Sequence, residues 1–222
     1  LLLCALPTLL TVSLTLLTWT PWYHQRQIQK LELALSQRLG VAVEIADVRR
    51  PSPDSWQLEG IELSDPETGA LVSKVRTILY TRQNGFVGIH LSQPELQAAQ
   101  LSLVWRIVHD RFLCQPDLLG EAVSLTAQDL SIHSHTQGLT LSPVRVRIDP
   151  QAAETRAWAQ FALAGWNPED ALASISVTRF RAGDAPRTVW ELQTGSKSLP
   201  CSVLADYLPI MRRLGIDAEF SG

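Results

Sequence analysis

Residues 139–163, LTLSPVRVRIDPQAAETRAWAQFAL, alternate between apolar and polar side chains in two runs separated by a short polar segment. Successive side chains of a strand point to opposite faces of a sheet, so a period of two places the apolar residues on one face. The stretch therefore predicts two antiparallel strands, 139–148 and 155–163, that share one apolar face. The residues that define this face most clearly are Val144, Val146, Ile148, Phe161 and Leu163.

The same alternation recurs along most of the chain after residue 40. Turn residues such as SDPETG at 64–69 and the Asn84-Gly85 pair separate the runs, and short loops normally join antiparallel neighbours. The sequence therefore predicts a mainly β fold over residues 41–222, in which a curved antiparallel meander sheet forms a groove or a partial barrel. The other predicted strands are 41–46, 56–59, 61–63, 71–80, 86–91, 95–103, 121–125, 129–135, 174–181, 188–193 and 216–220.

Three segments have a helical period instead. In residues 24–40 the apolar side chains recur every three or four positions, and Gly40 suits the left-handed residue that ends a helix. The second segment, 101–113, has leucine, valine and aromatic residues at the same spacing. The third, 198–214, is interrupted by Pro209. We therefore expect two or three short helices beside the sheet.

The first residues of the chain predict a membrane anchor. Leu1 to Thr18 contains no charge, and a helix over residues 1–23 would be about 35 Å long, enough to cross a hydrocarbon core of about 30 Å. A cleaved signal peptide is the alternative, but TWTP at 18–21 is a poor cleavage site. The sequence therefore favours an uncleaved transmembrane signal anchor over residues 1–23. The aromatic residues expected at its membrane interface are Trp19, Trp22 and Tyr23.

Composition limits the partners. The formal net charge is −3 and the pI is about 6.0, so the chain lacks the basic surface that nucleic acid requires. Of the three cysteines, Cys4 falls in the anchor. The other two, Cys114 and Cys201, have no metal-ligand spacing; they could form a long-range disulfide or remain separate buried thiols.

The sequence contains no recognisable catalytic motif: the P-loop, the dinucleotide glycine pattern, the nucleophile elbow and HExxH are all missing. His133 and His135 lie two apart on a predicted strand, which suits a metal only if further ligands, such as His90 or His109, converge on them. An exposed polar strand face is the simpler interpretation. We therefore predict that the chain is not an enzyme and binds neither a metal nor a cofactor.

The apolar face of the sheet needs a cover, and the predicted helices are too few to hide all of it. The face could be filled by the protein's own side chains, as an ordinary core, or by the acyl chains of lipids. Five tryptophans allow the same two interpretations, ordinary packing or a lipid-contacting stripe. They are Trp56, Trp105, Trp158, Trp166 and Trp190.

The order of these features resembles the start of the AsmA-like proteins of the bacterial envelope. In that family an anchor precedes a helix, a phrase of the form RLG-V-V-I--V and a strand that carries L-G--L-DP--G. The residues of this chain that match are Arg38, Leu39, Gly40, Val43, Ile45, Val48, Leu58, Gly60, Ile61, Leu63, Asp65, Pro66, Gly69 and Val75. The segments LSQPELQAAQLSL and DLSIHSHTQGLTLSPVRVRI also look like the repeated hairpins of that group.

The resemblance implies a single-pass protein of the bacterial inner membrane whose C-terminal domain lies in the periplasm. It implies phospholipid transport or a part in outer-membrane biogenesis, through an apolar sheet groove. The residues expected to line this groove are Val144, Val146, Ile148, Phe161 and Leu163. Membrane lipids would be its partners, together with other envelope proteins. Two alternatives remain: a scaffolding envelope domain with a closed core and no ligand, and an anchored hydrolase with an unrecognised site. Because Phe220–Gly222 stop in a predicted strand, we expect the N-terminal part of a longer protein.

Overall fold

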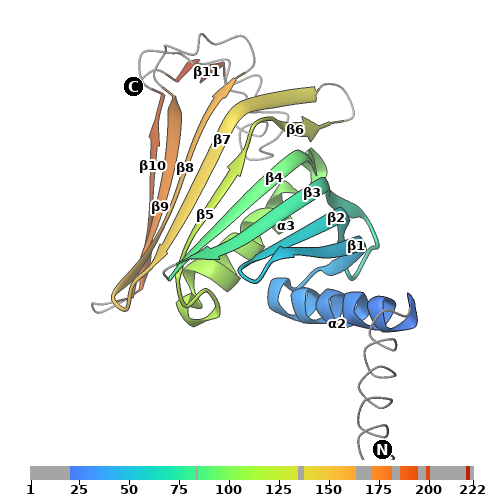
Figure 1. Ribbon diagram of the computed structural model, residues 1–222. Coiled ribbons are helices and arrows are strands. Elements are labelled where there is room, and N and C mark those ends of the chain that lie inside the picture. The colour runs from blue at the N-terminus through green and yellow to red at the C-terminus, as the bar shows by residue number, and fades with distance from the viewer. Residues whose placement is uncertain are drawn as a thin grey trace, which may run out of the picture.

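The computed structural model describes residues 21–83, 85–134, 138–163, 172–181 and 186–194, together with the backbone of two short strands, 199–200 and 219–220. These residues form a mainly β fold, as predicted (Figure 1). A ten-stranded sheet runs in the order β1-β2-β3-β4-β5-β7-β8-β9-β10, and β6 pairs with β4 and β7. The sheet curves around one helix, α3, which lies on its inner face.

The elements have the following bounds. The helices are α2 (Pro21–Leu39) and α3 (Leu101–Ile107), with short turns η1 (Ala98–Gln100), η2 (Val108–Leu113) and η3 (Pro116–Leu118) around α3. The strands of the large sheet are β1 (Ala42–Ser52), β2 (Ser55–Ser64), β3 (Leu71–Gln83), β4 (Phe86–Gln97), β5 (Ala122–Ala127), β6 (Leu130–His133), β7 (Gly138–Pro150), β8 (Glu154–Leu163), β9 (Ala173–Phe180) and β10 (Arg187–Gln193). Two short strands, β11 (Leu199–Pro200) and β12 (Glu219–Phe220), pair with each other.

The prediction of a simple meander is wrong at β4. This strand pairs in parallel with β5, where Ile89 lies opposite Leu125, and in parallel with β6. Parallel neighbours need a crossover rather than a hairpin, and here the crossover is the helical segment 98–118. The predicted helix over 101–113 is confirmed, but the predicted strand 95–103 ends at Gln97, because the helical spacing takes over there.

Within the described residues, helix α2 runs from Pro21 to Leu39. It ends as predicted: Gly40 has φ +75° and donates its N–H to the carbonyl of Ser36 at 2.8 Å. None of the helices in the described residues is both long and apolar enough to span a membrane. The predicted anchor residues 1–20, with Trp19, lie outside the described residues. The predicted helix over 198–214 is wrong at its start, where residues 199–200 form strand β11, and the rest of it lies outside the described residues.

Helix α2 packs along the free edge of β1 and satisfies its backbone. The Ser36 hydroxyl accepts the N–H of Val43 at 3.0 Å, and the Glu32 carboxylate accepts the N–H of Ile45 at 2.8 Å. Further along, Asp47 contacts His24 of the helix at 2.9 Å. The hydrogen bond from His24 lowers the pKa of Asp47, a slight burial opposes this, and Arg49 adds to the lowering. Side chains of α2 thus take the place of a neighbouring strand.

Replacing Glu32 by alanine is expected to lower the free energy of unfolding by about 1–3 kcal/mol, because it leaves the Ile45 N–H without its charged acceptor. Hydrogen exchange of the Ile45 amide should become faster. Glu44→Ala is the matched control, since it removes a carboxylate from an exposed position on β1. Equal losses of stability in the two variants, measured by urea unfolding, would contradict the capping role.

Strand β2 changes its buried face at Gly60. Leu58 and Ile61 are both buried although they lie three apart, which strict alternation forbids. Gly60 between them has φ +61°, and an added Cβ would lie 2.8 Å from the Cβ of Ala46 on β1. Strand pairing aligns Gly60 of β2 with Arg76 of β3, and Arg76 with Gln93 of β4. Gln93 also has a positive φ, 51°. A line of irregular backbone therefore crosses the N-terminal half of the sheet.

Two hydrophobic clusters meet on α3. In the first, Leu103 of the helix packs with β1–β3 and with Ile28 of α2. In the second, Trp105 packs with the fully buried Leu113 of η2 and with residues of β7–β9. The helix therefore fills the inner face between the two halves of the sheet.

Candidate functional site

The register brings the five predicted groove residues together on β7 and β8. Val144 lies opposite Phe161, and Leu141 lies opposite Leu163. Val146 and Ile148 lie opposite alanines of β8 and alternate with arginines, so they share the face of Val144. Ile148 belongs to the cluster on α3 and η2, so this face of β7–β10 is the inner face.

Burial differs along this face. Ile148 packs against the cluster of Trp105, Val108 and Leu113, so the helical segment covers this end. Val144 is also buried, at 6% exposure. Val146, Phe161 and Leu163 are half-buried and belong to neither cluster formed by the described residues. The inner face therefore has a covered end at α3 and a less covered end toward Leu163.

The apolar face extends further than the sequence indicated. One row of the register crosses five strands and reaches the exposed Leu192 on β10, whose side chain is 45% exposed. Strand pairing puts these residues side by side, and the alternation within one strand could not reveal such a partner. The members of the row are Leu125, Val146, Ala159, Ile175 and Leu192.

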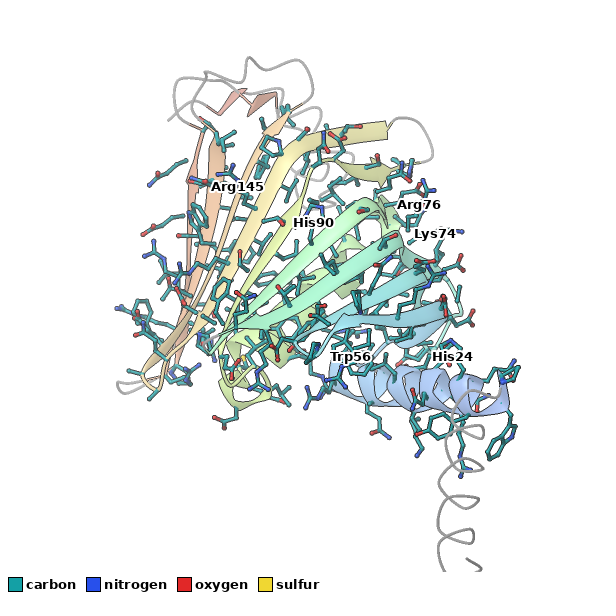
Figure 2. The ribbon with its side chains drawn as sticks, in the orientation of Figure 1. His24, Trp56, Lys74, Arg76, His90 and Arg145 are labelled. Carbon is teal, nitrogen blue, oxygen red and sulfur yellow. The ribbon has the colours of Figure 1, made fainter. Side chains whose placement is uncertain are left out.

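The outer face of the same strands is polar. Arg147 bonds Asp149 at 2.9 Å, and Ser176 donates to the Glu191 carboxylate at 3.2 Å. The exposed Arg145 and the ring of His90 also belong to this face, where His90 contacts Thr126 at 3.1 Å (Figure 2). Six outer residues of β8–β10 line a shallow polar hollow: Arg156, Trp158, Ser174, Ser176, Glu191 and Gln193. The sheet thus separates an apolar surface from a polar one.

The described tryptophans do not form one stripe. Trp105 of α3 and Trp190 of β10 meet on the inner face with ring centroids 4.1 Å apart. Trp158 lies on the polar outer face, and Trp56 lies under the guanidinium of Arg50, 5.0 Å from the ring centroid. Trp166 lies outside the described residues. The contact of Trp105 with Trp190 is ordinary packing that joins the last strand of the sheet to α3.

The histidines and cysteines do not assemble a site in the part of the chain that the structure describes. His133 has one carboxylate partner, Glu95, at 3.7 Å, and no group of three potential ligands occurs among these residues. The free thiol of Cys114 lies 3.9 Å from both ring nitrogens of His109. An activated nucleophile instead makes a short hydrogen bond to one nitrogen of its base. His135 and Cys201 lie outside the described residues, and the free thiol of Cys114 agrees with the alternative of separate cysteines rather than with the disulfide.

The two interface residues that can be placed lie in the first turn of α2. Trp22 is 62% exposed and Tyr23 is 38% exposed. The guanidinium of Arg26, one turn along the helix, lies 5.3 Å from the centre of the Trp22 ring. An aromatic residue and a cation are therefore neighbours at the start of the helix.

No protein-family model and no curated protein sequence matches the chain. The resemblance to AsmA-like proteins therefore remains a prediction carried by the residues quoted for it. What bears on function in the fold is the contrast between the apolar inner face and the polar outer face of one curved sheet.

Proposed function

We propose that this chain is a membrane-anchored, AsmA-like envelope protein of the bacterial inner membrane whose inner sheet face holds the acyl chains of phospholipids. In this proposal the sheet lies in the periplasm and takes part in phospholipid transport or outer-membrane biogenesis. The observation that carries the proposal is the incompletely buried apolar surface of Val146, Phe161 and Leu163 beyond the helix.

The physical argument rests on surface area. Each Å² of apolar surface removed from water stabilises a complex by about 25 cal/mol, so a row of incompletely buried apolar side chains favours an apolar ligand. An acyl chain has no polar group that would need a partner on this face. The polar outer face, with Arg145 and Arg147, stays in water.

Helix α3 sets the limit of the proposed groove. Ile148 already packs on the helical segment and Val144 is buried, so an acyl chain would contact Val146, Phe161 and Leu163 and would stop before Ile148. Ile175 of β9 packs on the same cluster as Ile148, and beyond it in the row Leu192 of β10 offers a further exposed apolar side chain.

The covered end also favours a second candidate, a scaffolding domain with a closed core. Because Leu103 and Trp105 of α3 already fill part of the inner face, the protein's own side chains could complete the cover. The two functions differ in whether phospholipid occupies the end of the face near Phe161.

The test uses the full chain, purified in mild detergent and examined by native mass spectrometry for bound phospholipid. Val146→Asp and Phe161→Asp are expected to weaken lipid binding about tenfold or more, because a loss of 1.4 kcal/mol already gives a factor of ten and a carboxylate beside an acyl chain costs more. Gln160→Asp is the matched control, since it adds the same charge next to Phe161 on the outer face.

A measurement on the unmodified chain guards against variants that fail to fold. A phospholipid with a photoreactive group in its acyl chain should label the peptides of β7 and β8 that contain Val146 and Phe161. Circular dichroism checks the fold of each variant. Labelling spread evenly over the two faces of the sheet, or no bound phospholipid in the wild-type chain, would favour the scaffolding domain.

A further inference from the structure

The outward side of α2 carries a stripe that the sheet does not use. Its inward side chains pack on β1, whereas positions at spacings of four, four and three form an exposed row on the opposite side. Trp22 and Leu33 are its apolar members, at 62% and 61% exposure. The members of this row, which we call the outward stripe, are Trp22, Arg26, Lys30 and Leu33.

The charge on α2 is one-sided. The helix contains one carboxylate, Glu32, and that group points inward to the N–H of Ile45. His24 likewise contacts Asp47 of the sheet. The side that faces away from the sheet therefore carries Arg26 and Lys30 without a carboxylate of the same helix beside them, in a chain whose formal net charge is −3.

Exposed tryptophan and leucine interleaved with lysine and arginine are typical of a helix that lies in the interface of an anionic membrane. Each basic residue close to such a surface contributes on the order of 1 kcal/mol of attraction, and the tryptophan ring suits the headgroup layer. Arg26 over the Trp22 ring lets both groups occupy the same depth.

We propose that the outward stripe of α2 lies flat on an anionic phospholipid surface. The proposal rests on the membrane attachment proposed above and adds the lipid class and the contact surface. Because α2 is fixed along β1 by hydrogen bonds from Val43 and Ile45, a helix that lies on the membrane also sets the orientation of the sheet. The edge of β1, along which α2 lies, would then run along the bilayer (Figure 1).

The sequence offers a built-in reporter, because it contains three lysines: Lys30, Lys74 and Lys197. Lys30 is in the outward stripe. Lys74 lies on β3, two strands from the α2 edge, and its side chain is 53% exposed in an ion pair with Glu62 (Figure 2). Acylation of amines followed by mass spectrometry can therefore compare Lys30 with Lys74 within one molecule.

The experiment reconstitutes the full chain in nanodiscs of phosphatidylcholine alone or of phosphatidylcholine mixed with phosphatidylglycerol. The ratio of Lys30 to Lys74 acylation is expected to fall several-fold in the anionic discs and to recover at high salt, which screens the attraction. Arg26→Glu should abolish this fall. Arg145→Glu, the same charge change on the outer face of β7, should leave it intact.

The outcomes separate this inference from the proposed function. Equal acylation ratios in both kinds of disc, with the chain still in the discs, would overturn the anionic contact and leave the anchoring intact. A chain that does not co-purify with discs at all would overturn both. Protection of Lys30 that appears only when envelope extract is added would identify a protein partner and also overturn the lipid contact.

Discussion

Gly60→Ala is expected to lower the free energy of unfolding by about 2–5 kcal/mol, one of the two largest effects that a single substitution should have. Two costs add: the left-handed backbone at φ +61° disfavours any side chain, and the new Cβ would lie 2.8 Å from the Cβ of Ala46. Urea unfolding of the full chain in detergent, followed by tryptophan fluorescence, measures the change.

Gly69→Ala separates these two costs. Gly69 has φ +69° in the loop between β2 and β3, but nothing lies within 4 Å of its added Cβ. This control should lose only about 1–2 kcal/mol, the cost of the left-handed backbone. In the Gly60→Ala background, Ala46→Gly removes the contact and should recover part of the difference. A loss at Gly60 no larger than the loss at Gly69 would show that the close approach to β1 has no energetic weight.

Leu113→Ala should also lower the free energy of unfolding by about 2–5 kcal/mol, because it leaves a cavity in a fully buried site. Leu113 packs with Ala157 and Val177 of the C-terminal strands, and its carbonyl accepts a hydrogen bond from Arg181 at 3.0 Å. The substitution should also loosen Trp105, which belongs to the same cluster and rests on Trp190. Urea unfolding gives the stability change, and the near-ultraviolet circular dichroism of the tryptophans reports the local change.

The matched control is Leu79→Ala on β3, where the side chain is 36% exposed. The two variants lose the same atoms, so the difference between them isolates the burial of Leu113 between η2 and the C-terminal strands. If Leu79→Ala destabilised the protein as much as Leu113→Ala, the cluster on η2 would not hold the helical segment on the C-terminal strands.

Most strands could be predicted because their signal is local. The alternation in 139–163 needs only neighbouring residues, and β7 and β8 follow it with Val144 opposite Phe161. The crossover was harder: the sequence indicates the helix over 101–113, but the pairing of β4 with β5 depends on residues far apart in the chain. Partners such as Ile175 and Leu125 were missed on the candidate face for the same reason.

The bend at Gly60 had a signal that alternation alone does not interpret. Leu58 and Ile61 lie three apart within one strand, which indicates either a break in the strand or a change of its buried face. Glycine between them permits the second outcome, but the contact with Ala46 depends on the pairing of β1 with β2. The capping of β1 by Glu32 was hidden in the same way, since an acidic residue on an amphipathic helix ordinarily indicates a solvated face.

The capped edge of β1 gives the sheet a direction of growth. Side chains of α2 occupy the backbone N–H groups of Val43 and Ile45, so no further strand can pair at these positions. Within the described residues, a strand could be added to the large sheet beyond β10, the strand at its opposite edge. Any lengthening of the apolar inner face would therefore proceed in one direction only, by adding strands at the β10 edge, away from α2.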